Sequence, residues 1–183
     1  MEKVQERPVV DTKNRTLLTG MFADRDSAER AYDTLNKRGY SKDEINVIMS
    51  DDTRKKHFGE KTEKTELGTK AMEGAGKGSI IGGTVGAIAG AIAAIGTTLL
   101  IPGLGFVIAG PIAAAVAGAG AGGITGGLIG ALVGSGIPED RAKVYESGVK
   151  NGKIVMGVNP RTNEDADFFE NDWRTNKGEE VYR

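Results

Sequence analysis

The feature that most constrains this chain is a long segment without charge. No Asp, Glu, Lys or Arg occurs from Gly78 to Pro138, although such residues make up 27% of the sequence. Small residues recur there at every fourth position. One series is Gly74, Gly78, Gly82, Gly86, Gly90 and Ala94, and the other is Gly110, Ala114, Gly118, Gly122, Gly126, Gly130 and Gly134. Because residues four apart follow one face of a helix, this spacing predicts two helices packed backbone to backbone.

We expect these helices to form a hairpin within residues 74–136, with arms at about 79–101 and 106–134. At 1.5 Å per residue the first arm would be about 35 Å long, enough to cross a hydrocarbon core of roughly 30 Å. Glycine pairs in the second arm leave open whether it is one helix or two. The predicted turn residues are Pro102, Gly103 and Gly105. The predicted helix-packing residues are Gly78, Gly82, Gly86, Gly90, Gly118, Gly122, Gly126, Gly130 and Gly134.

The composition excludes several kinds of site. The chain has no cysteine, one histidine and a formal net charge of −1. Disulfides, thiolate zinc sites and sites with two imidazoles are therefore excluded, and no overall positive charge favours nucleic acid. The glycine-rich residues 74–79 lack the spacing of a phosphate-binding loop, since Lys77 is followed by Gly78. We expect no catalytic residue, cofactor, metal or small-molecule substrate.

Both flanks of the uncharged segment have the patterns of a small α/β domain. After a disordered tail at 1–14, residues 15–50 predict a strand, a helix between Asp24 and Gly39, and a second buried strand at 45–49. Residues 51–73 are densely charged and predict a linker or an exposed helix. Residues 137–173 predict a helix, a strand at 153–158 and a last helix, followed by a tail at 174–183.

The flanking sequences resemble one bacterial family. Residues 19–52 (TGMFADRDSAERAYDTLNKRGYSKDEINVIMSDD) and residues 137–158 (IPEDRAKVYESGVKNGKIVMGV) are similar to the general-stress, heat-induced (YflT-like) family with a glycine-zipper insert. The resemblance implies a small ferredoxin-like (βαβ…αβ) domain of the α+β class, split by a long Gly/Ala-rich helical hairpin. It also implies a role in stress, and it carries no catalytic residues.

The predicted strands are one too few for that fold. Three strands are expected where a ferredoxin-like domain needs four. An unpaired sheet edge is normally covered. We therefore expect a second copy of the chain to supply the missing pairing, as a homo-oligomer.

These patterns predict a non-enzymatic, stress-associated protein that inserts in or associates with the cytoplasmic membrane, with both termini in the cytoplasm. The expected partners are other copies of the chain, through glycine-zipper contacts, and membrane lipid. The alternative is a cytoplasmic, soluble structural assembly, such as a filament, ring or shell, whose hairpins bury one another. A pore is disfavoured because threonines are nearly all that would line its lumen.

Overall fold

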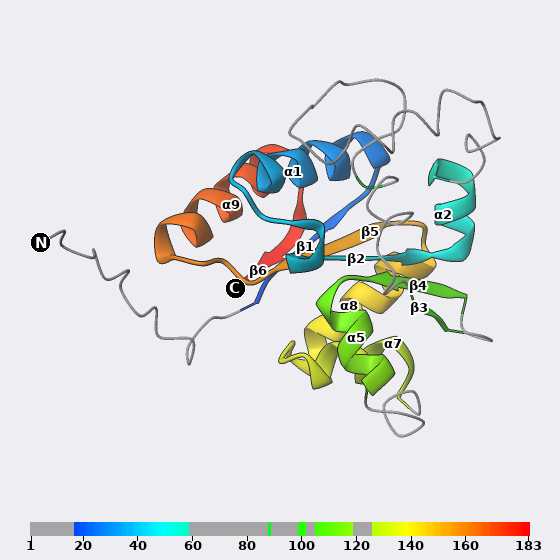
Figure 1. Cartoon of the computed structure of the whole chain (residues 1–183). Coiled ribbons are helices and arrows are strands. Elements are labelled where there is room, and N and C mark those ends of the chain that lie inside the picture. Colours follow the sequence, from blue (N-terminus) through cyan, green and yellow to red (C-terminus); the bar gives the residue numbers. More distant parts are fainter. Residues whose placement is uncertain (1–16, 59–87, 89–98, 102–104, 119–125) are drawn as a thin grey trace, which may run out of the picture.

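The computed structural model describes residues 17–58, 88, 99–101, 105–118 and 126–183. The predicted tail at 1–14, most of the predicted linker and most of the predicted first arm lie outside these residues. Within them, one antiparallel sheet is covered by helices on both faces (Figure 1). The mixed α/β class expected from the sequence is therefore confirmed.

Six strands form the sheet, in the spatial order β3-β4-β2-β5-β1-β6. They are β1 Leu18–Phe22, β2 Ile45–Ser50, β3 Leu99–Ile101, β4 Phe106–Ala109, β5 Ile154–Val158 and β6 Glu179–Tyr182. Every neighbouring pair is antiparallel. Nearly every residue of β1, β2, β4 and β5 is buried, because helices cover both faces.

The helices divide into two layers. They are α1 Arg25–Lys37, α2 Asp51–Phe58, α5 Pro111–Gly118, α7 Gly127–Gly134, α8 Glu139–Lys150 and α9 Asn163–Thr175, with a short 3-10 helix η2 at Lys42–Glu44. In Figure 1, α1 and α9 lie above the sheet and α5, α7 and α8 lie below it. The expected cap residues bound α1, since the Asp24 carboxylate accepts from the Ser27 N–H and Gly39 has φ 81°.

Two crossover connections interlock in the sheet. The chain passes from β1 through α1 to β2, and β5 lies between those two strands. It later passes from β5 through α9 to β6, and β1 lies between that pair. The chain between β2 and β5 adds β4 and β3 to one edge of the sheet and supplies the helices of the lower face (Figure 1).

The prediction of a helical second arm at about 106–134, left open as one helix or two, is wrong at the start of the arm. Residues 106–109 form strand β4, and α5 and α7 have 8 residues each. Eight residues span about 12 Å, well short of a bilayer core. The run Phe106-Val107-Ile108 favours a strand, because β-branched and aromatic side chains suit a pleated, buried surface. At the end of the predicted first arm, Leu99–Ile101 is also a strand. No helix in the described parts of the chain is long and apolar enough to cross a membrane.

The prediction of a C-terminal tail at 174–183 is also wrong. Helix α9 continues to Thr175, and Glu179–Tyr182 forms β6 against β1. The turn between them passes through Lys177 at φ 63°. Strand β6 is the fourth strand, which the sequence patterns did not predict, and it pairs with β1. The missing strand therefore no longer argues for a second copy.

The sheet separates two hydrophobic cores. Alternate residues of each strand point to opposite faces, so Phe22, Val47 and Met156 belong to the core under α1 and α9. Met21, Ile48 and Val155, one position away, belong to the core under α5, α7 and α8. Sequence reasoning had placed the helix after Pro138 in the α/β domain, and α8 does belong there, but on the face opposite α1.

Candidate functional site

The predicted glycine interface is described only in its second half. Gly118 ends α5, Gly126 is the N-cap of α7, Gly130 lies within α7, and Gly134 ends it. Gly105, predicted in the turn between two helical arms, has φ 65° and lies between strands β3 and β4. The remaining predicted residues, which are Gly78, Gly82, Gly86, Gly90, Gly122, Pro102 and Gly103, lie outside the described residues.

Among the described residues, Gly126 and Gly134 show no close contact with another helix. A Cβ placed on Gly134 would meet no atom within 4 Å. A Cβ on Gly126 would lie 2.9 Å from the Cα of Gly130, one turn along its own helix. Instead, α7 packs inward through Leu128, Ala131 and Leu132. The outer side of α7 therefore has free space around Gly134.

The outer sides of α5 and α7 carry small and apolar residues. The exposed residues are Ala114, Ala115 and Ala117 of α5 and Gly126, Val133 and Gly134 at α7. We call these six the small-residue surface. Val133 is 42% exposed, and α5 packs beside α7. The surface derives entirely from the uncharged segment, so none of its residues is charged.

A buried amide attaches α5 to the sheet. The Asn46 side chain is 1% exposed on β2. Its Oδ1 accepts a hydrogen bond of 2.7 Å from the Ile112 N–H, and its Nδ2 donates to the Gly157 carbonyl at 3.2 Å. Gly110 makes the approach possible, since it has φ 95° and a Cβ there would lie 2.2 Å from the Ile45 carbonyl oxygen. Sequence reasoning missed this anchor, although a polar residue inside the run INVIM was its signal.

Two features hold helix α8 against β1. The Tyr145 hydroxyl donates to the Glu180 carbonyl at 2.7 Å and lies 2.8 Å from the Thr19 hydroxyl. Burial raises the pKa of Tyr145, so this hydroxyl keeps its proton. Gly148 lets the helix approach closely, since a Cβ there would lie 2.0 Å from the Met21 Sδ. These contacts are structural and leave no reactive group free.

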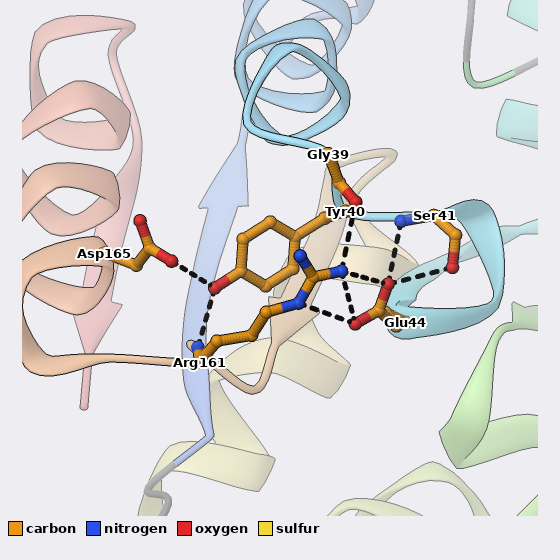
Figure 2. Close-up of polar contacts among 6 residues, drawn as sticks. All are labelled: Gly39, Tyr40, Ser41, Glu44, Arg161 and Asp165. Atoms are coloured by element: carbon orange, nitrogen blue, oxygen red, sulfur yellow. Dashed lines mark hydrogen bonds and ion pairs between the residues drawn. The ribbon is translucent and has the colours of Figure 1, made fainter. Parts of the chain in front are cut away.

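Figure 2 shows a polar cluster where the two crossover connections meet. The Tyr40 hydroxyl donates to Asp165 Oδ2 at 2.7 Å and accepts from the Arg161 N–H at 2.6 Å. The Arg161 guanidinium binds both oxygens of Glu44 and lies 4.3 Å from the Tyr40 ring centre. Ser41 donates to Glu44 through its N–H and its hydroxyl. We call these five residues the Tyr40 clamp.

The charges of the clamp satisfy one another. Burial raises the pKa of Tyr40 to about 12, and the Asp165 carboxylate adds to this effect. Burial would also raise the pKa of Glu44, but hydrogen bonds from Ser41 and Arg161 outweigh it and hold that pKa below its usual value. Arg38 pairs with Asp165 and lies 3.7 Å from the Phe168 ring centre. The cluster therefore fastens loops together and offers no free acid, base or cation.

One carboxylate lies against the uncharged segment. Glu29 Oε2 on α1 accepts a hydrogen bond of 3.0 Å from the Ile88 N–H, and the Ile88 side chain is fully buried in the upper core. Glu29 Oε1 is buried without a hydrogen bond within the described residues, although Arg25 lies 3.5 Å away. Burial raises the pKa of Glu29, and the Ile88 N–H opposes that shift. Ile88 therefore packs against the α/β domain.

The described residues hold no cluster of three His, Cys, Asp or Glu side chains that could bind a metal ion. No protein family model matches the chain. No curated protein and no solved structure matches it significantly. Within the part of the chain that the structure describes, the residues of the small-residue surface have no evident structural role.

Proposed function

We propose that this chain is a non-enzymatic, self-assembling protein whose copies contact one another through the small-residue surface. The observation that carries the proposal is the exposure of apolar residues on two adjacent helices that lack any charge. The other described helices carry charges on their exposed faces; α8, for example, pairs Lys143 with Glu139 and Lys150 with Glu146. Exposed apolar residues on adjacent helices are typical of an interaction site.

Small residues suit such a contact. Alanine and glycine let two helix backbones approach closely, and Cα–H···O contacts then add to dispersion. Gly134 has the free space that a neighbouring helix would need. In this proposal the predicted glycine-zipper contacts form between molecules, at Gly126, Gly130 and Gly134. The remaining predicted glycines would extend this contact.

We further propose that the four strands β2-β5-β1-β6, with α1 and α9, form a ferredoxin-like domain. Its support is the pair of interlocking crossovers with both helices on one face. Strands β3 and β4 with helices α5 and α7 would then be an insertion between the second and third strands of that domain, and α8 would pack on the lower face of its sheet. This arrangement is consistent with the resemblance to the general-stress family, from which the proposed role in stress derives.

A second candidate is attachment of the same surface to the cytoplasmic membrane. The exposed Val133 and the absence of charge favour it, since an apolar surface enters the headgroup boundary more readily than a charged one. In this case α5 and α7 would lie at the membrane surface, because each helix is too short to span the bilayer. Self-assembly in the cytoplasm and attachment to lipid use the same residues, so one set of variants tests both.

The experiment compares two valines of equal exposure. Val133 on the small-residue surface is 42% exposed, and Val144 on charged helix α8 is 40% exposed. Val133→Glu and Val144→Glu therefore introduce the same charge at matched sites. The mass of each protein is measured by sedimentation velocity over a range of concentrations, and flotation with neutral lipid vesicles is measured alongside.

We expect the wild type and Val144→Glu to assemble and Val133→Glu to remain monomeric, because the new charge would be buried in the contact. A monomeric wild type, or equal behaviour of the two variants, contradicts self-assembly through this surface. If the wild type is monomeric but floats with vesicles, and only Val133→Glu fails to float, the lipid candidate is correct.

A further inference from the structure

The two edges of the sheet differ in protection. At one edge, the register of β6 against β1 shifts between Thr19 and Met21, and Glu180 has φ 51°. The same strand carries Glu179 and Glu180, which pair with Lys153 and Arg141. Bulges and charges are the devices by which proteins prevent an edge strand from pairing with another chain. The β6 edge is therefore blocked.

The β3 edge has neither device. Leu99, Leu100 and Ile101 pair with Ile108, Val107 and Phe106 in unbroken register, and β4 pairs with β2 without a shift. The nearest charged residues in sequence are Lys77 and Glu139. Among the described strands, none pairs with the outer side of β3. An edge strand has backbone N–H and C=O groups on its outer side, and another extended strand satisfies them best.

We propose that β3 pairs with β3 of a second copy, antiparallel and about a two-fold axis at Leu100, so that two sheets become one. A strand pairing with its own copy is self-complementary, as a two-fold interface requires. With three residues, only an axis at Leu100 pairs all of them, placing Leu99 of each copy opposite Ile101 of the other. The pairing thereby fixes the register of the dimer.

This pairing rests on the proposed self-assembly, which supplies the rest of the contact. Three residues of strand bury far less than the roughly 1,200–2,000 Å² of a stable interface. Helix α5 packs on β3, so joining two β3 strands brings the α5 helices of both copies to the same interface. The strand would set the orientation of the two copies and the small-residue surface would add area.

Cysteine cross-linking tests the register, because the chain has no cysteine of its own. Directly opposite residues in an antiparallel pair have Cα atoms about 4.5–5.5 Å apart, within the range for a disulfide. Leu100→Cys should form a linked dimer under mild oxidation. Leu99→Cys and Ile101→Cys should each link poorly alone and well when mixed. Glu180→Cys, at the blocked edge, is the control for random collision.

We expect about tenfold more dimer from Leu100→Cys, and from the mixture, than from Glu180→Cys, because pairing holds the thiols together. Melting of each reduced variant checks its fold, and the mixture decides if Leu100→Cys does not fold. Equal linking by all variants, or no gain on mixing, overturns the pairing. If the cross-linking yields do not differ in this way but Val133→Glu still makes the protein monomeric, the pairing of β3 is wrong and the proposed function stands. If the yields differ as expected but Val133→Glu still assembles, β3 pairs between copies and the small-residue surface is not part of the interface.

Discussion

The two helical layers on this sheet are built from different side chains. The core under α1 and α9 is rich in aromatic residues, namely Phe22, Tyr32, Tyr40, Phe169 and Trp173. The core under α5, α7 and α8 is mainly aliphatic, with Phe106 and Tyr145 as its aromatic members. Edge-to-face contacts such as Phe22–Trp173, with ring centres 5.8 Å apart, join strand and helix on the aromatic side. Large rings thus fill one layer, and small residues allow close approach in the other.

The outer surfaces of the layers differ in the same sense. On the aromatic side, ion pairs and the Tyr40 clamp link α1, η2 and α9. On the aliphatic side, α5 and α7 have no charged residue with which to make such links. A surface whose charges are already paired within the molecule resists association, because a partner would have to desolvate them. The contrast explains why we assign self-assembly to the lower layer.

The largest expected effect comes from truncating the aromatic layer. Trp173 is fully buried, so Trp173→Ala should lower the free energy of unfolding by about 3–5 kcal/mol, as measured by urea denaturation. Leu132→Ala, at an equally buried site on the other side, should cost about 2–5 kcal/mol. Trp173→Phe should cost less than Trp173→Ala, partly because the buried indole N–H has no partner within the described residues. A smaller loss for Trp173→Ala than for Leu132→Ala would contradict the view that the aromatic layer is the more stabilising one.

Two glycines sharpen the comparison within the lower layer. Gly148→Ala on α8 should destabilise by about 1–3 kcal/mol, because its Cβ would lie 2.0 Å from the buried Met21 Sδ. Gly134→Ala on α7 meets no atom within 4 Å. It should be neutral or stabilise the monomer by up to about 1 kcal/mol, since alanine favours a helix. Both changes in stability are to be measured by thermal melts at low protein concentration. An equal loss of stability in the two variants would contradict the open space around Gly134.

The sequence predicted the parts of this fold that local patterns specify. The strand, helix and strand at 18–50 were expected because Asp24 and Gly39 bound the helix and apolar runs flank it. Strand β6 was missed because Glu179 and Glu180 disguise a four-residue strand whose burial depends on Val181 alone. The strands at 99–101 and 106–109 were missed because they lie in the uncharged segment between two helical patterns of small residues, one ending at Ala94 and the other beginning at Gly110. Strand β6 lies far from its partner β1 in sequence, and β4 lies far from its partner β2, so no local pattern predicts these pairings.

The candidate surface was predicted only in outline. The absence of charge from Gly78 to Pro138 marked the right segment as one that avoids water. It did not reveal which of these residues fill the molecule's own lower core. Ile112 and Leu132 are buried while Ala115 and Val133 are exposed, and this division depends on where the sheet lies. Asn46, which holds α5 in place, lies on β2, outside the uncharged segment. The sequence of that segment therefore could not predict this contact.

A moderate effect is expected from the Tyr40 clamp. Tyr40→Phe removes the hydroxyl that joins Asp165 to the Arg161 N–H. The free energy of unfolding should fall by about 1–2 kcal/mol, because the partly buried Arg161 N–H loses its acceptor and Asp165 Oδ2 loses a donor while Arg38 still pairs with Oδ1. Tyr182→Phe is the control, since the Tyr182 hydroxyl makes no hydrogen bond within the described residues. If both variants are equally stable, the clamp does not hold the two crossovers together.

The smallest expected effect concerns Glu29, where the charged layer meets the uncharged segment at Ile88. Burial raises the pKa of Glu29 above its usual 4.5. Between that value and the raised one, the folded protein holds a proton that the unfolded chain has lost, so this group's contribution to stability falls as pH rises through the window. Glu29→Gln keeps an oxygen for the Ile88 N–H and abolishes the ionisation. The variant should therefore gain in melting temperature relative to the wild type as pH rises from about 4 to 7, by about 1–3 °C. A difference that stays constant with pH, or that shrinks, would mean that Arg25 compensates the Glu29 charge fully and that burial does not govern this carboxyl.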